Sequence, residues 1–473
     1  MSCSDVVAAE PTGSAGARRA GAVVRAATAL VAGGAAMATI AGCGDAVLLT
    51  VTGDRAVPAE LDAICLAVAD RDPAGGAFGR MYRLEGDLGR LPQTLAVQPG
   101  GASSAEAWVR GFRGGVEVAA DRAGVDFGGD VSLRLDRCAP GGSAAPVAAD
   151  PVGPGDARLA VSMGRGGARV VAVGAGGAAW IDADGGALVA TDLALPAGRG
   201  VIAFDADGDC DDDVLVWTDA EVRLFHRGVT DLDDGEVIAS EAIRAAAAAD
   251  VDRDGDVDLL LGGGATLRLY RNDGGHFTAD ATAIPGGAAS DVTALALGDL
   301  DGDGNPDVVV GQGDAAGAPP RALLADASGQ GVFALAPAIL PDVALQVRDL
   351  ALADVDGDGD LDLGVALAGA PVRLYVNRGG RLEDQSFVRL PQPAPEGASL
   401  AIADWTGDCK PDLAVAVPAG SVLWRGEQVG TTDAFTADAA AAGASAVRYL
   451  DLDDDGRRDL VLATPGGVTW LRR

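Results

Sequence analysis

The chain has 473 residues and a formal net charge of −33, from 69 acidic and 36 basic residues. This acidity argues against a nucleic-acid partner, because the phosphates would be repelled. Apolar residues make up 48% of the chain and it has 69 glycines, which fits packed cores with many turns and a length sufficient for two domains and a leader.

Residues 1–42 have the features of an export leader. Several arginines precede a short apolar segment, 26–41, which is too short for a membrane-spanning helix. The leader ends in Ile40-Ala41-Gly42-Cys43, which resembles the lipobox of bacterial lipoproteins. The resemblance implies cleavage before Cys43 and lipidation of its thiol. We therefore expect an exported protein anchored by lipid in the bacterial cell envelope, at the outer membrane or cell surface; an ordinary secretory signal cut nearby is the alternative.

Residues 43–138 predict a small β-sandwich domain. Its expected strands are short apolar runs separated by turn residues: Val47–Val51, Ile64–Val68, Thr94–Val97, Val116–Ala119 and Val131–Leu135. Cys65 and Cys138 lie near the two ends of this domain, and we expect them to form a disulfide in an exported protein. Residues 139–157 are rich in Gly, Pro and Ala and predict a linker.

An acidic loop recurs six times within residues 158–473. In the clearest copy, Asp354–Asp362, carboxylates occupy positions 1, 3, 5, 7 and 9, glycines occupy positions 4 and 6, and an apolar run follows. Ca²⁺ prefers six to eight oxygen ligands, and glycine permits the tight turns that wrap a loop around an ion. The pattern predicts a calcium loop between two strands. A solvated acidic turn is the alternative for any single copy.

The candidate metal ligands are the aspartates at positions 1, 3, 5 and 9 of each loop. Thr406 replaces the carboxylate at position 3 of the fifth loop. An EF-hand is excluded, because position 12 is Val or Leu in every copy, where an EF-hand has Glu. The ligands, loop by loop, are Asp205, Asp207, Asp209 and Asp213; Asp250, Asp252, Asp254 and Asp258; Asp299, Asp301, Asp303 and Asp307; Asp354, Asp356, Asp358 and Asp362; Asp404, Asp408 and Asp412; and Asp451, Asp453, Asp455 and Asp459.

The loops begin 45 to 55 residues apart, which is the period of propeller blades with four short strands each. A strand and turn, seen in Arg268–Gly275 and Arg373–Gly380, recurs in phase. An upstream unit at 159–186 keeps the register without the carboxylates, so we interpret it as a blade with an empty loop. The sequence predicts an all-β protein with a seven-bladed propeller, or six blades as the alternative. We expect residues 144–149 to supply the last strand and close the ring.

These loops and turns resemble the FG-GAP/VCBS repeat family, which includes the propeller head of integrin α-subunits. The resemblance covers residues 159–473. It implies that aspartates at positions 1, 3, 5 and 9 hold about five or six Ca²⁺ ions. It also implies a recognition or adhesion module, so we expect a monomer that binds an unidentified protein or polysaccharide.

No catalytic motif accompanies the repeats, and we expect a protein that is not an enzyme. The two histidines, His226 and His276, belong to no metal or nucleophile motif. The alternatives are a polysaccharide-acting enzyme on the same scaffold and a purely structural envelope protein. Cys210 and Cys409 occupy position 6 of two loops. We expect them to be turn residues in place of glycine and not partners of each other.

Overall fold

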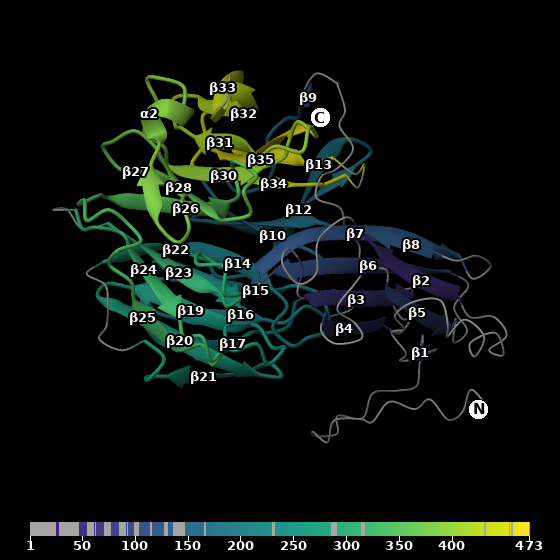
Figure 1. Ribbon diagram of the computed structural model, residues 1–473. Helices are drawn as coiled ribbons and strands as arrows, with labels where there is room; N and C mark the ends of the chain where they lie inside the picture. Colours follow the sequence, from purple (N-terminus) through teal and green to yellow (C-terminus); the bar gives the residue numbers. More distant parts are fainter. Residues whose placement is uncertain are drawn as a thin grey trace.

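The computed structural model describes most of the chain from residue 147 onward and separate segments before it. The described residues are 25–27, 47–53, 61, 63–70, 77–84, 91, 93–98, 104–113, 116–126, 131–135 and 147–472, except 165–166, 229–231, 285–290, 314–316, 430–431, 454 and 456. They form an all-β protein, as predicted, with two N-terminal sheets beside a β-propeller (Figure 1). Cys43 and Cys138 lie outside the described residues.

The N-terminal part consists of two four-stranded sheets with a shared core. The first has the order β1 (Arg25–Ala27), β5 (Gln93–Gln98), β2 (Val47–Thr52), β8 (Val131–Arg134), and the second has the order β4 (Ala77–Arg83), β3 (Ala63–Asp70), β6 (Ser104–Arg113), β7 (Val116–Asp126). Leu49 and Leu133 of the first sheet and Ile64 of the second are fully buried in that core. β4 and β6 were not predicted from the sequence. β1 falls within the segment expected to be an export leader.

The described residues of the propeller form seven four-stranded antiparallel sheets in chain order, each made from consecutive strands except the last. The first three sheets are β10 (Arg158–Ser162), β11 (Arg169–Gly174), β12 (Gly177–Asp184), β13 (Ala187–Leu193); β14 (Gly200–Phe204), β15 (Asp213–Trp217), β16 (Val222–Phe225), β17 (Glu236–Ala239); and β18 (Ala245–Ala249), β19 (Asp258–Gly263), β20 (Thr266–Asp273), β21 (His276–Asp280).

The remaining four sheets follow the same pattern. They are β22 (Val292–Gly298), β23 (Asp307–Gln312), β24 (Arg321–Ala325), β25 (Phe333–Leu335); β26 (Val347–Ala353), β27 (Asp362–Leu367), β28 (Arg373–Asn377), β29 (Leu382–Asp384); β30 (Ser399–Ala403), β31 (Asp412–Ala416), β32 (Ser421–Val429), β33 (Thr432–Ala441); and β34 (Ala446–Leu450), β35 (Asp459–Thr464), β36 (Gly467–Arg472), β9 (Val147–Ala148). A single helical turn, α2 (Ser386–Arg389), follows β29.

The second strand of each sheet is the most buried. Every residue of β15, β19, β23, β27, β31 and β35 is buried, because these apolar runs lie between neighbouring sheets. Small residues let the sheets approach closely. A Cβ on Gly311 of β23 would lie 2.5 Å from the side chain of Val347 in the next sheet, and one on Gly262 of β19 would lie 2.3 Å from Val292. Glycine at these positions therefore fits sheet-to-sheet contact.

The sheets close into a ring. Each first strand contacts the first strand of the next sheet, from β10 to β34, and β34 contacts β10. The last sheet is completed by β9, which pairs with β36 and lies within the segment 144–149 expected to close the ring. The closure extends beyond β9, since Val152 and Val468 exchange backbone hydrogen bonds of 2.8 and 2.6 Å. Among the described residues, no helix is long and apolar enough to cross a membrane.

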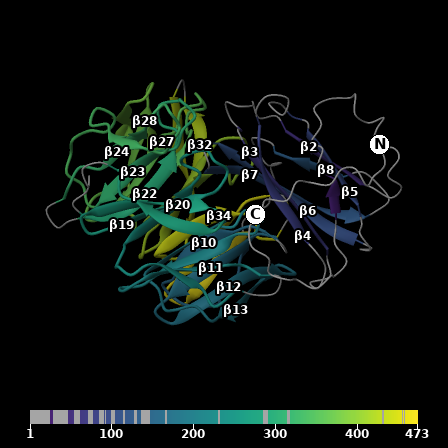
Figure 2. The ribbon, with the colours of Figure 1, turned by 90° about the horizontal axis from the view of Figure 1, so that it is seen from below.

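The N-terminal sheets lie against one side of the propeller (Figure 2). They contact the acidic loops of its second and third sheets. Trp108 of β6 donates its indole N–H to the carbonyl of Cys210 at 3.0 Å, and Arg110 pairs with Asp212 at 2.5 Å with both side chains buried. Arg83 of β4 pairs with Asp250 at 2.9 Å. Aromatic and basic residues of the sandwich thus contact the first two acidic loops.

Candidate metal centres

The first carboxylate of each loop organises the turn that follows it. Asp354 accepts the backbone N–H groups of Gly357 and Asp358 on Oδ1, at 2.7 and 3.2 Å, and that of Gly359 on Oδ2 at 2.9 Å. Both glycines have positive φ, 75° and 95°, which allows three successive N–H groups to converge on one carboxylate. The same three contacts are made to the first residue of three other loops: Asp205, Asp299 and Asp404.

The carboxylate at position 9 was predicted from the sequence only as a metal ligand, but it also has a structural role. Asp362 is fully buried, and its Oδ2 accepts the N–H of Val355 at 2.8 Å while its Oδ1 accepts the N–H of Asn377 at 2.7 Å. It therefore joins the start of its loop to the third strand of its own sheet. Equivalent pairs of hydrogen bonds are made by Asp213, Asp258, Asp307 and Asp412.

Two asparagines tie neighbouring loops together. Asn272 of β20 donates its side-chain amide to the carbonyl of Val257 in its own loop at 3.0 Å and to that of Ala206 in the preceding loop at 2.8 Å. Asn377 of β28 does the same with Leu361 and Leu300, at 3.2 and 2.8 Å. The recurring strand and turn seen in the sequence thus positions one acidic loop relative to the next.

The structure brings the predicted ligands together in four loops. Oxygens of three carboxylates lie within 4.8 Å of one another in each of these groups: Asp205, Asp207 and Asp209; Asp250, Asp252 and Asp254; Asp299, Asp301 and Asp303; and Asp354, Asp356 and Asp362. Asp404, Asp408 and Asp412 of the fifth loop have the same backbone contacts as the others, and Thr406 is buried beside them.

Buried oxygens without hydrogen-bond partners fit a bound cation. Oδ1 of Asp356, at position 3, makes no hydrogen bond within the described part of the chain, although its side chain is only 6% exposed. Two other buried oxygens also make no hydrogen bond within the described residues. They are Oδ1 of Asp453, at position 3 of the last loop, and the amide oxygen of Asn305, at position 7 of the third loop. A buried oxygen left unpaired is costly, so an oxygen-preferring ion such as Ca²⁺ suits these positions.

Burial raises the pKa of several aspartates in these loops when no cation balances their charge. It raises the pKa of Asp258, Asp307, Asp362 and Asp459, all at position 9, to about 7, and that of Asp412 to about 6. At position 1, burial raises the pKa of Asp250 to about 6 and that of Asp205 well above its usual range. A divalent cation would stabilise the charged form of the same groups.

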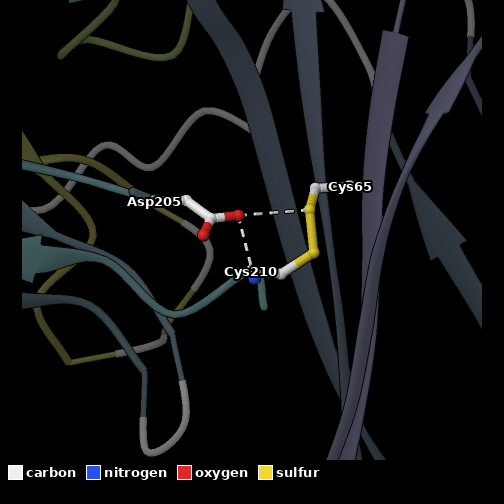
Figure 3. A group of neighbouring side chains, drawn as sticks. All are labelled: Cys65, Asp205 and Cys210. Carbon is white, nitrogen blue, oxygen red and sulfur yellow. Dashed lines mark hydrogen bonds between the residues drawn. A yellow bond between two sulfur atoms is a disulfide. The ribbon is translucent and has the colours of Figure 1, made fainter. Parts of the chain in front are cut away.

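A disulfide joins the sandwich to the first acidic loop (Figure 3). It links Cys65 of β3 to Cys210, so the predicted Cys65–Cys138 pair is wrong. Both sulfurs are fully buried, and the Cys65 sulfur lies 3.7 Å from Oδ2 of Asp205. Cys65 packs with Trp108 and Phe112 against Cys210, which explains the pairing: this face of the second sheet meets the propeller.

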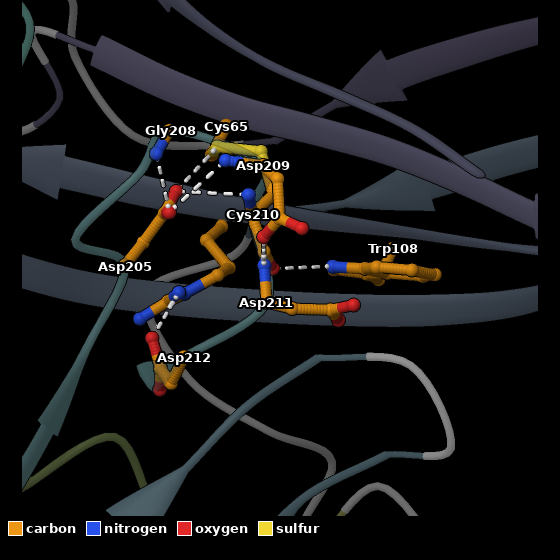
Figure 4. Close-up of a disulfide and its surroundings, with 9 residues drawn as sticks. Cys65, Trp108, Asp205, Gly208, Asp209, Cys210, Asp211 and Asp212 are labelled. Carbon is orange, nitrogen blue, oxygen red and sulfur yellow. Dashed lines mark hydrogen bonds and ion pairs between the residues drawn. A yellow bond between two sulfur atoms is a disulfide. The ribbon is translucent and has the colours of Figure 1, made fainter. Parts of the chain in front are cut away.

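Cys210 and Cys409 also have the turn conformation that was predicted for them. Their φ angles are 66° and 68°, where the other loops with described position 6 have glycine. They are not partners of each other, because Cys210 pairs with Cys65, and Cys409 takes part in a disulfide as well. Figure 4 shows how the loop around Cys210 is held: Trp108 and the Cys65 sulfur approach it from the sandwich, while Asp205 accepts its backbone N–H.

Removing the Cys65–Cys210 disulfide is expected to lower the free energy of unfolding by about 3 kcal/mol, because the bond closes a long loop in the unfolded chain. The variant is Cys65→Ala with Cys210→Gly, since glycine keeps the positive φ at position 6. Thermal melts in calcium would measure the loss. A melting temperature equal to that of the unaltered chain, or a non-reducing peptide map without a Cys65–Cys210 peptide, would contradict the assignment.

Comparison with known proteins supports the repeat assignment. The family model described as FG-GAP-like repeat matches residues 250–310 and 354–415, which contain the second to fifth acidic loops. The chain is similar to the solved structure of an Agrocybe aegerita lectin studied for specific recognition of non-reducing terminal N-acetylglucosamine, with 16% identity, a TM-score of 0.46 and coverage of 67% of this chain and 86% of that one.

It is also similar to BBS1N, solved in complex with ARL6DN and soaked with lead, with 12% identity, a TM-score of 0.45 and coverage of 68% of this chain and 93% of that one. No curated protein sequence matches the chain. The chain therefore contains FG-GAP-like repeats at residues 250–310 and 354–415, within a β-propeller of four-stranded sheets.

Proposed function

We propose that this FG-GAP repeat propeller is a calcium-stabilised binding module of the bacterial cell envelope. In this proposal the acidic loops hold Ca²⁺, the leader exports the chain, and Cys43 carries a lipid that anchors it at the outer membrane or cell surface. The propeller then presents a rigid surface to a protein or polysaccharide partner. The calcium part of the proposal is supported by four of the repeated loops, in each of which oxygens of three carboxylates lie within 4.8 Å of one another.

The observation that carries the calcium proposal is the unpaired buried oxygen at position 3. Asp356 and Asp453 each keep an oxygen without a hydrogen bond while their neighbours at positions 1 and 9 are held by backbone N–H groups. The loop backbone is therefore fixed by the chain itself. In the fourth loop, oxygens of Asp354, Asp356 and Asp362 lie within 4.8 Å of one another. The ion would supply positive charge to a site that the fold has already arranged.

Rigid loops also support a role in binding rather than in a switching movement. The carboxylates at positions 1 and 9 accept hydrogen bonds from backbone N–H groups of the loop. The side-chain amides of Asn272 and Asn377 hold adjacent loops together. A calcium ion placed there would strengthen an existing scaffold. Preorganised surfaces lose less entropy when a partner binds.

The proposal is tested by the Asp301→Asn variant of the third loop, compared with the unaltered chain. Asp301 sits at position 3, and no described cationic side chain pairs with it. We expect calcium titration by calorimetry to show several sites with dissociation constants of about 10⁻⁴–10⁻³ M in the unaltered chain, and one site fewer in the variant. The matched control is Asp326→Asn, an exposed aspartate outside the loops, which should leave the count unchanged. No calcium binding by the unaltered chain would overturn the proposal.

A further inference from the structure

Within the described residues, basic side chains pair with the carboxylate at position 3 of some acidic loops but not of others. Arg271 pairs with Asp252, at position 3 of the second loop, at 2.9 Å and lies 4.0 Å from Asp258 at position 9. Arg389 pairs with Asp356 in the fourth loop at 2.9 Å, and Arg378 joins it at 3.1 Å. These are the carboxylates that a calcium ion would bind.

The last loop has the same arrangement. Arg472 pairs through Nε with Asp453, at position 3, and lies 3.8 Å from Asp455 at position 5. In the second, fourth and sixth loops, a guanidinium group therefore pairs with the carboxylate at position 3. In the third loop, no described cationic side chain pairs with Asp301.

The strand register explains the difference between these loops. Tyr270 pairs with Leu259 and Leu323 pairs with Val308, both immediately after position 9, so Leu324 occupies in β24 the place of Arg271 in β20. By the same register, Arg472 has this place in β36 and Val376 has it in β28. In the fourth loop, where Val376 has this place, the arginine that pairs with position 3 is Arg389 of α2.

Arg271 and Arg389 are held in place by more than the loop carboxylates. Arg271 donates to the carbonyls of Gln330 and Gly331 at 2.6 and 3.0 Å and to Asp280 at 3.3 Å. Gly331 leaves the necessary space, because a Cβ there would lie 2.5 Å from Nη1 of Arg271. Arg389 is 5% exposed and donates to the carbonyl of Asp433 at 2.9 Å. Anchored in this way, the guanidinium groups stay beside the loops.

We infer that Arg271, Arg389 and Arg472 set the calcium affinity of their loops, so that the third loop binds Ca²⁺ tightly and the second, fourth and sixth bind it weakly. The inference rests on the calcium binding proposed above. An ion entering the second loop must displace the Arg271 guanidinium from Asp252 or share that carboxylate with it, and either lowers its affinity. In the third loop Leu324 offers no such competitor.

The test is the Arg271→Gln variant, with Arg268→Gln as its matched control. Arg268 lies on the same strand but pairs with Glu241, away from the loop. Equilibrium dialysis at about 0.1 mM free Ca²⁺ is expected to show more bound calcium in Arg271→Gln than in the unaltered chain, through an affinity gain of about tenfold at the second loop. Arg268→Gln should match the unaltered chain. In chelator, Arg271→Gln should melt about 2–4 °C lower, because Asp252 loses its partner.

A converse variant keeps the test independent of how well Arg271→Gln folds. Leu324→Arg places an arginine beside the third loop, and Leu324→Gln controls for the loss of the apolar side chain. Leu324→Arg should bind about tenfold less tightly at this loop than Leu324→Gln does. Calcium binding that is the same in Arg271→Gln, Arg268→Gln and the unaltered chain would overturn the inference and leave the proposed function intact. No binding in any of these proteins would remove the proposed function itself.

Discussion

In chelator, the melting temperature of the chain is expected to fall by about 5 °C as the pH is raised from about 5 to about 7.5. The cause is the set of buried aspartates at position 9, four of which have a pKa of about 7 in the folded chain against 3.8 as the ordinary value. Between these two values the folded state binds more protons than the unfolded state, so stability is lost as pH rises. If each group contributes only about 0.5–1 kcal/mol after screening by water, the sum is still several kcal/mol.

Calcium should reverse this dependence. At about 2 mM, an ion with a dissociation constant near 10⁻⁴ M adds about 1.8 kcal/mol per site, and protons compete with it at low pH. The melting temperature in calcium should therefore be nearly level or rise over the same pH range. His226, whose hydrogen bond to Asp213 raises its pKa to about 9, acts in the same direction as the aspartates in chelator, because its stabilisation disappears above that pH. Parallel pH profiles with and without calcium would contradict calcium binding at these loops.

Asp362→Ala is expected to lower the free energy of unfolding by about 4–5 kcal/mol, whether or not calcium is present. The substitution leaves the backbone N–H groups of Val355 and Asn377 buried without an acceptor, and each such group costs about 1–3 kcal/mol. It also removes the link between the loop and the third strand. Chemical denaturation in calcium and in chelator would measure the change.

Two further variants separate the structural role of Asp362 from a ligand role. Asp362→Asn keeps one acceptor oxygen and should lose about half as much stability. Asp360→Ala, at position 7 of the same loop, removes a carboxylate that accepts no hydrogen bond from another described residue and should cost less than about 1 kcal/mol. A cost for Asp362→Ala that disappears in chelator would mean that this residue acts only as a calcium ligand.

The repeated parts of the fold could be predicted from the sequence because each local signal occurs several times in phase. The acidic loops and the apolar runs after them repeat every 45 to 55 residues, so their common register shows through the variation of any one copy. The N-terminal sandwich has no repeats, so each of its strands had to be predicted from a single weak signal. Its β4 and β6 were missed because both strands, Ala77–Arg83 and Ser104–Arg113, mix charged and apolar residues.

The contacts between the two parts could not be predicted in the same way. Cys65 and Cys210 are 145 residues apart, and nothing in the spacing of the cysteines shows which face of the sandwich meets the propeller. The partner of Asp356 is a similar case. Its pairing with Arg389 depends on how α2 folds back onto the loop, which has no sequence periodicity. Truncation of Asp356 would therefore leave a buried arginine unpaired, and Asp301 is the better reporter of calcium.

The covalent link between Cys65 and Cys210 determines how tension would travel through the molecule. A pull applied to the chain ahead of Cys65 reaches the propeller directly at Cys210, in its second sheet. The 144 residues between the two cysteines, including the two-residue strand β9 that completes the last sheet, then carry no load. A short antiparallel pairing of this kind would otherwise be the first part to peel away. If the chain is tethered to a membrane at its N-terminal end while its partner is on another surface, the ring can remain closed under a force that would open an unlinked propeller.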